Sequence, residues 1–119
     1  MAKHIERGKE GEALGCRYLE KKGYTILCCN WRSGHYEIDI IALKDEKIHF
    51  IEVKTRHSIK FGYPEESVTR KKFYFLKKAA AIFLCQFKEV KRIQFDILSI
   101  SIIYGKEIEY YFIEDVYLY

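Results

Sequence analysis

One segment, EIDIIALKDEKIHFIEVK, constrains the fold of this chain more than any other. Its two halves, Glu37 to Leu43 and Ile48 to Lys54, are rich in β-branched and aromatic residues and flank a short polar segment. This pattern is typical of a β-hairpin, because strands favour such residues and tight turns favour polar ones. We therefore expect two antiparallel strands joined by a two-residue turn centred on Asp45 and Glu46.

A two-residue turn also fixes which residues lie opposite each other, and directly opposed residues share a face of the sheet. The predicted pairs on one face are Leu43 with Ile48, Ile41 with Phe50, Asp39 with Glu52, and Glu37 with Lys54. The pairs on the other face are Ala42 with His49, Ile40 with Ile51, and Ile38 with Val53. Both faces carry many apolar side chains, so we expect the hairpin to lie in the middle of a sheet.

Asp39 and Glu52 are therefore expected to face each other inside the protein. This arrangement costs repulsion and desolvation free energy unless a cation lies between the two carboxylates. Two carboxylates and water suit Mg²⁺ or Mn²⁺ better than zinc, which prefers His and Cys. The main-chain carbonyl of Val53 is a further candidate ligand. The Lys54 ammonium, on the same side, is suited to orient a water molecule or to offset charge on a phosphate.

The same charges admit a simpler interpretation. Glu37, Asp39, Glu52 and Lys54 would then form an ordinary solvated salt-bridge patch, which the bare spacing of these residues favours. The neighbouring segments IDIIAL and FIEVK favour the metal site instead, because they indicate that the charges interrupt buried strands.

Periodicity elsewhere predicts two helices and three further strands. The helices are expected over Ile5 to Lys22 and Val68 to Phe87, and the strands over Thr25 to Trp31, Arg92 to Ile103 and Glu107 to Ile113. The element order is αβββαββ, which predicts an α/β fold. The chain length of 119 residues favours one domain spanning residues 1–119.

The first predicted helix carries Gly8, Gly11 and Gly15 on one face, within an arc that also contains Glu12. Each glycine inside a helix costs about 0.5 to 1 kcal/mol relative to alanine. That cost is most easily recovered where the helix backbone must approach a sheet or a ligand closely. Glu12 would then lie near the carboxylates, although a single helical glutamate is more commonly a surface charge.

The charge balance, 21 basic against 17 acidic side chains, suits a polyanionic partner without requiring one. Basic side chains follow the third predicted strand and begin the second predicted helix. The residues expected to contact nucleic acid are Arg56, Lys60, Arg70, Lys71 and Lys72. The simpler alternative is that the helical lysines only make a surface soluble.

Four cysteines, Cys16, Cys28, Cys29 and Cys85, lack the paired C-x-x-C spacing of a zinc ribbon, and we expect them to be buried thiols. The apolar runs fall far short of the roughly 20 residues that cross a bilayer, so we expect no membrane partner. The charged N-terminal segment lacks the features of an export signal, which predicts a cytoplasmic location.

Five segments carry a resemblance to a known family: GKEGEALGCRYLEKKGYTIL, NWRSGHYEIDIIA, FIEVKTR, FGYPEESV and QFDIL. With them the chain resembles the YraN-like family of predicted endonucleases, distant relatives of archaeal Holliday junction resolvases. The resemblance implies the restriction-endonuclease-like fold of the PD-(D/E)xK superfamily, with a central mixed sheet of about five strands flanked by two helices. It implies metal-site and catalytic positions for Asp39, Glu52 and Lys54, with Glu12 and Glu37 as acidic neighbours.

The resemblance implies a Mg²⁺- or Mn²⁺-dependent endonuclease that hydrolyses phosphodiester bonds, with DNA favoured over RNA and with structured or branched DNA as one substrate class. Two positions depart from the family pattern: Tyr36 replaces a glycine, and Gln94 replaces an arginine. One alternative is a noncatalytic module that binds nucleic acid or docks a partner while retaining the fold. Another is an interaction protein whose C-terminal segment, EYYFIEDVYLY, provides a docking strand or the edge of a homodimer.

Overall fold

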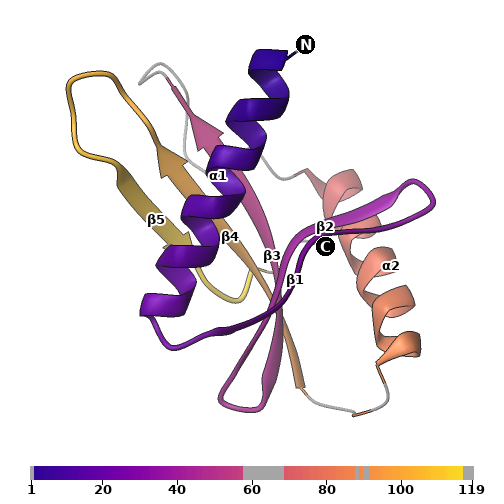
Figure 1. Ribbon diagram of the computed structural model, residues 1–119. Coiled ribbons are helices and arrows are strands. Elements are labelled where there is room, and N and C mark those ends of the chain that lie inside the picture. Colours follow the sequence, from indigo (N-terminus) through magenta and orange to yellow (C-terminus); the bar gives the residue numbers. More distant parts are fainter. Residues whose placement is uncertain (1, 58–68, 88, 90–91, 117–119) are drawn as a thin grey trace.

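The computed structural model describes residues 2–57, 69–87, 89 and 92–116. These residues form two helices and one five-stranded sheet, and Figure 1 shows their arrangement. The elements are α1 (Ala2–Lys21), β1 (Thr25–Ser33), β2 (Tyr36–Lys44), β3 (Lys47–Arg56), α2 (Arg70–Gln86), β4 (Arg92–Ser101) and β5 (Glu109–Ile113). The predicted α/β fold and its order αβββαββ are confirmed.

The strands lie in the order β1-β2-β3-β4-β5, so β2 and β3 are interior strands, as predicted. Neighbouring strands are antiparallel except for β3 and β4, which are parallel. The chain between those two strands contains α2, because parallel neighbours need a crossover connection. The predicted mixed sheet is therefore confirmed, and β4 and β5 form the predicted closing hairpin.

The turn between β2 and β3 is the predicted two-residue turn. Asp45 and Glu46 have φ values of 51° and 62°, a conformation whose twist matches that of the flanking strands. The register follows the prediction from Lys44 opposite Lys47 to Ile40 opposite Ile51. The ladder stops there, so the prediction that Asp39 with Glu52 and Glu37 with Lys54 continue it is wrong.

The two helices cover opposite faces of the sheet. Phe73, Leu76 and Phe83 of α2 pack with Ile41 and Phe50 in one buried cluster. Leu19 of α1 packs with a different set, comprising Ile40, Ala42, Ile51, Leu98 and Ile100. From Ile40 to Ala42, successive residues of β2 thus face different helices, as a regular strand requires.

The predicted close approach of the first helix to the sheet is confirmed at two of its glycines. A Cβ atom at Gly11 would clash with the side-chain oxygen of Thr55 on β3. A Cβ atom at Gly15 would lie 3.1 Å from Ile40 Cδ1 and 3.3 Å from Leu98 Cδ2. The surroundings of Gly8, the third glycine of the predicted face, lie outside the described residues.

The second helix begins two residues later than predicted, because Thr69 acts as its N-cap. The Thr69 hydroxyl accepts a hydrogen bond from the Lys72 N–H at 3.2 Å, which satisfies a free main-chain donor of the first turn. Val68, the predicted first residue, lies outside the described residues. In the described part of the chain, no helix has the length and apolar character needed to span a membrane.

The expectation that all four cysteines are buried is wrong. Cys29 on β1 and Cys85 on α2 are exposed, while Cys16 and Cys28 are half-buried. Strand β1 is an edge strand, and Cys85 lies near the end of α2, so their surroundings are less complete than those of interior positions.

Candidate functional site

Asp39 lies where strands β2 and β3 stop pairing. Its Oδ2 accepts a hydrogen bond from the Val53 N–H at 2.8 Å, so a side chain takes a main-chain donor that a continuing ladder would use. The side-chain alternation of β2 also changes here. Ile38 packs in the cluster with α2, whereas Ile40 packs in the cluster with α1, although the two would share a face in a regular strand. The predicted placement of Ile38 with Ile40 is therefore wrong.

The surroundings of Asp39 disfavour its ionised form. Burial is the largest cause, and repulsion from Glu52 is the second; together they raise the pKa of Asp39 to about 7, against the lowering effect of the Val53 hydrogen bond. Repulsion from Glu12 and Glu37 makes smaller contributions to this raised pKa. The predicted carboxylates are thus close enough to act on one another, even though the regular ladder ends before them.

Glu52 and Lys54 lie on the same strand, two residues apart. Lys54 Nζ is 3.5 Å from Glu52 Oε1, and each side chain retains about a quarter of its exposure, at 24% and 26%. Their partial exposure leaves both groups accessible to a ligand. Asp39, Glu52 and Lys54 are therefore brought together, as the sequence predicted, but through an interrupted strand pair.

The acidic neighbours differ in their environments. Glu12 on α1 is half-buried, and burial followed by repulsion from Glu37 raises its pKa, whereas Arg32 lowers it. The close contact of α1 with Thr55 at Gly11 brings this helix to the end of β3 that carries Lys54, and Glu12 is near enough to Asp39 to raise its pKa. Glu37 is more exposed and forms an ion pair with Arg32, with Arg32 Nη2 at 3.3 Å from Glu37 Oε2. Glu12 is therefore the more enclosed of the two.

A hollow of about 370 Å³ opens beside these residues, between the sheet and α2. Its charged lining residues are Glu37, Glu52, Lys54 and Lys72. The side chain of Lys54 lowers the pKa of Lys72, whereas Glu52 and Asp39 raise it. Lys72 was predicted only as a nucleic-acid contact, yet it reaches the candidate site itself. The first turn of α2 is the element that places it there.

The donor set determines which metal ion this region could hold. In residues 9–57, 69–87, 89 and 92–116, no three His, Cys, Asp or Glu side chains are grouped so that they could hold a metal ion. This excludes a preformed cage of carboxylates among those residues. Mg²⁺ needs less from the protein, because it keeps several water ligands and binds through one or two carboxylates. Asp39 and Glu52, which repel each other, meet that smaller requirement.

The predicted nucleic-acid contacts are placed only in part. Arg56 ends β3 and is half-buried, and its carbonyl accepts a hydrogen bond from the Ile102 N–H at 2.7 Å. Arg70, Lys71 and Lys72 are exposed in the first turn of α2. Lys60 lies outside the described residues. The described basic groups thus extend from the end of β3 to the beginning of α2.

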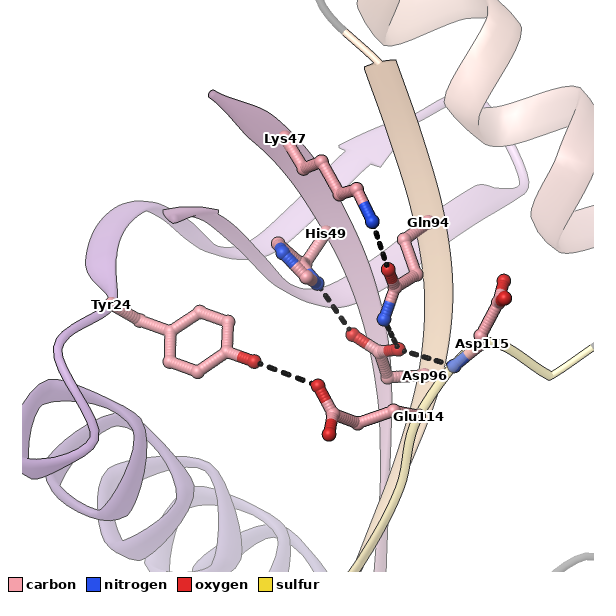
Figure 2. Close-up of polar contacts among 7 residues, drawn as sticks. All are labelled: Tyr24, Lys47, His49, Gln94, Asp96, Glu114 and Asp115. Atoms are coloured by element: carbon pink, nitrogen blue, oxygen red, sulfur yellow. Dashed lines mark hydrogen bonds and ion pairs between the residues drawn. The ribbon is translucent and has the colours of Figure 1, made fainter. Parts of the chain in front are cut away.

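A second polar cluster lies toward the other end of β3 and was missed at the level of sequence (Figure 2). His49 Nδ1 and Asp96 Oδ2 are 2.8 Å apart, and both residues are buried. Asp96 Oδ1 also accepts hydrogen bonds of 2.9 Å from Gln94 Nε2 and from the Asp115 N–H. A charged residue inside the apolar run QFDIL was the available signal. Because its partners satisfy Asp96, we interpret this cluster as structural.

Comparison with known proteins shows that the residues of the candidate metal site lie in a region that this chain has in common with a protein family. The model of the uncharacterised protein family UPF0102 matches residues 11–100. A UPF0102 protein of Syntrophomonas wolfei is 47% identical over 105 residues, covering 85% of this chain and 89% of that protein. UPF0102 proteins of Bacteroides thetaiotaomicron and Flavobacterium psychrophilum are 41% and 43% identical over 100 residues, covering 84% of this chain and 83% and 84% of those proteins. The match includes every residue of the candidate metal site.

Proposed function

The chain belongs to the UPF0102 family, which is uncharacterised, and we propose that it is a Mg²⁺- or Mn²⁺-dependent endonuclease of the PD-(D/E)xK superfamily, as its YraN-like sequence pattern implies. One observation carries the proposal. The half-buried Asp39 carboxylate lies at an interruption between two interior strands, beside Glu52 and close to the Glu52–Lys54 ion pair. A regular sheet does not require such an interruption, whereas irregular backbone is common at functional sites.

Asp39, Glu52 and the main-chain carbonyl of Val53 are the groups proposed to hold the metal ion. When bound, a divalent cation lowers the pKa of a water molecule and offsets negative charge on a phosphate. The environment of the Asp39 carboxylate favours the binding of such a cation. Burial and repulsion disfavour ionised Asp39, and a nearby positive charge favours the ionised form.

The two lysines of the hollow are proposed to hold the phosphate. The lowered pKa of Lys72 reflects the proximity of Lys54, and two adjacent ammonium groups repel each other. An anionic phosphate between them relieves that repulsion and accepts their hydrogen bonds. Lys54, which also contacts Glu52, is the group proposed to orient the attacking water. Glu12 and Glu37 are proposed to assist by adding negative potential around the metal.

The proposed substrate is DNA, including structured or branched forms. Arg70 and Lys71 begin α2 beside Lys72, so positive charge continues outward from the hollow. Arg56 adds a further basic residue at the end of β3. Positive side chains in such a series are suited to follow successive phosphates of a nucleic-acid backbone. We propose that Lys60, which lies outside the described residues, also contacts nucleic acid.

A second candidate function is a noncatalytic module that binds nucleic acid or docks a partner. Two observations favour it: the Asp39 carboxylate already accepts the Val53 N–H, and the described residues contain no group of three metal-binding side chains. Strand β5 lies at the edge of the sheet and carries the exposed Tyr111, which suits a docking strand or a homodimer edge. The two candidates differ in whether they cleave DNA.

The deciding experiment incubates the wild-type protein with linear, flapped and four-way-junction DNA, and with matched RNA, in Mg²⁺, Mn²⁺ or EDTA. Products are separated on a denaturing gel. Asp39→Asn is the test variant, because asparagine can still accept the Val53 hydrogen bond. Glu20→Gln, an exposed carboxylate on α1, is the matched control.

Metal-dependent DNA products that disappear in Asp39→Asn and persist in Glu20→Gln would support the nuclease. Equal cleavage by all three proteins would indicate a contaminant and would contradict the proposed site. Salt-dependent DNA binding without cleavage in any metal would favour the noncatalytic module instead.

A further inference from the structure

Cys16 of α1 and Cys29 of β1 lie in contact. Their Sγ atoms are 2.8 Å apart, which is roughly 0.8 Å more than the bonded separation of about 2.05 Å in a disulfide. The two residues are 13 positions apart in sequence and belong to different layers of the fold. The contact therefore comes from the packing of α1 on the sheet and not from chain proximity.

The other two cysteines are directed elsewhere. Cys28 is adjacent to Cys29, but it packs against the cluster that faces α2, whereas Cys16 packs against the cluster that faces α1. Cys85 is exposed on α2, which covers the opposite face. Of the four thiols in the chain, Cys16 and Cys29 are thus the pair that the fold brings together.

The main chain holds both cysteines in place. Cys16 directly follows Gly15, where α1 is packed so tightly that a Cβ atom would lie 3.1 Å from Ile40 Cδ1. Cys29 is paired with Ile40 in the ladder between β1 and β2. The two sulfurs thus meet between main-chain segments that are packed on one another, and a bond requires their separation to shorten by roughly 0.8 Å.

The two thiols differ in accessibility. Cys29 is exposed, so a small oxidant can reach its sulfur directly. Cys16 is half-buried, and burial together with its contact to Cys29 raises its pKa to about 12. Cys16 therefore keeps its proton at neutral pH and reacts after Cys29, when a disulfide sulfur lies beside it.

We propose that Cys16 and Cys29 form a disulfide site that reacts with a low-molecular-weight disulfide such as oxidised glutathione. The Cys29 thiolate attacks one sulfur of oxidised glutathione, which breaks its S–S bond, forms a Cys29–glutathione disulfide and releases one glutathione thiolate. Cys16 then loses its proton and attacks Cys29 Sγ, which releases the second glutathione. Two protein thiols are oxidised, and one glutathione disulfide is reduced to two thiols.

The resulting crosslink would join α1 to β1. It closes a loop that contains the end of α1, the turn after it and the first half of β1, and it reduces the number of conformations open to the unfolded chain. Cys16 lies one helical turn beyond Glu12, so the crosslink would also restrain the helix that carries this glutamate. The disulfide itself does not depend on the proposed nuclease activity.

The test equilibrates the purified full chain in glutathione buffers of increasing oxidised fraction, blocks the free thiols with N-ethylmaleimide, and measures intact mass and cleaved peptides. We expect the wild type to lose two alkylatable thiols and to yield a peptide pair joined through Cys16 and Cys29. The melting temperature of the oxidised form should rise by roughly 5 to 10 °C relative to the reduced form. Cys85→Ser should behave like the wild type.

Cys16→Ser separates the two steps, because it should retain glutathione on Cys29 and form no internal crosslink. Cys29→Ser, a change at an exposed position, should keep its three thiols alkylatable in unfolding conditions. The proposal is overturned if the oxidised wild type carries glutathione on Cys29 without a crosslink. It is equally overturned if all four thiols stay alkylatable, or if the crosslink involves Cys28 or Cys85.

Discussion

Asp39 is the residue on which the site depends, and its environment has a consequence for stability. Its pKa is raised from 3.8 to about 7, so the folded protein holds a proton that the unfolded chain releases. A raised pKa contributes stability that is fully present below pH 3.8 and is lost as the pH rises through about 7. The corresponding loss is on the order of 4 kcal/mol, since one pKa unit is about 1.36 kcal/mol.

The prediction compares the wild type with Asp39→Asn in EDTA, using urea unfolding at a series of pH values. The free energy of unfolding of the wild type should fall relative to that of the variant between pH 4 and pH 7. Carboxylates that do not interact with Asp39 titrate equally in both proteins, so the difference reports Asp39 together with the neighbours that repel it, chiefly Glu52. Parallel curves across this range would mean that Asp39 is already ionised at low pH.

A second prediction at the residue scale concerns the metal. At pH 8 a cation must overcome the burial and the repulsion that disfavour ionised Asp39. A ligand at 100 times its dissociation constant stabilises the folded state by about 2.7 kcal/mol. Mn²⁺ should therefore raise the melting temperature of the wild type by several degrees, and EDTA should reverse the shift. Asp39→Asn should show a much smaller shift, and Glu20→Gln should match the wild type; equal shifts in all three would place the ion elsewhere.

At the scale of elements, the sequence predicted the strands and helices more reliably than their irregularities. The hairpin register followed from the two polar residues of one turn, because antiparallel pairing propagates from a turn. The interruption at Asp39 did not follow, because it depends on a side chain replacing a main-chain acceptor. The glycines predicted that α1 lies close to the sheet, because at Gly11 and Gly15 a side chain would not fit between the helix backbone and the strands.

Contacts between elements that are distant in sequence could not be predicted, for a physical reason. The parallel register of β3 and β4, which places Ile51 opposite Asp96, is set by a crossover whose length leaves the offset undetermined. Without that offset, the sequence could not place His49 beside Asp96. Lys72 likewise reaches Lys54 only because α2 packs on one particular face of the sheet.

The Asp96 cluster yields a prediction at this scale, because it joins β3, β4 and the segment after β5 (Figure 2). Asp96→Ala removes the Asp96 partner of His49 Nδ1, of Gln94 Nε2 and of the Asp115 N–H. Removing one member of a buried pair costs about 3 to 5 kcal/mol. Urea unfolding should show a loss of that size, whereas Glu114→Gln, which alters an exposed residue with a single 3.4 Å contact from Tyr24, should cost far less. Equal losses in the two variants would contradict the central position of Asp96.

At the scale of the whole molecule, the candidate site and the buried Asp96 cluster lie toward opposite ends of β3. His49 lies near the beginning of the strand and Lys54 near its end. The end with the candidate site also carries Arg56 and adjoins the first turn of α2. Positive charge thus gathers at the end of the sheet where the proposed phosphate would bind, while the other end is held together by hydrogen bonds.

This arrangement predicts how DNA binding should depend on salt. Removing one basic side chain that binds a phosphate should reduce the slope of log K against log salt by about 0.9 on duplex DNA. In an Asp39→Asn background, which is expected not to cleave, Arg70→Gln with Lys71→Gln should lower the slope by up to about 1.8, measured by fluorescence anisotropy at salt concentrations from about 50 to 300 mM. The matched control, Arg17→Gln with Lys21→Gln, removes two exposed charges from α1. Because α1 is not part of the proposed DNA surface, the control should leave the slope unchanged; if both pairs lower it equally, net charge and not the beginning of α2 governs binding.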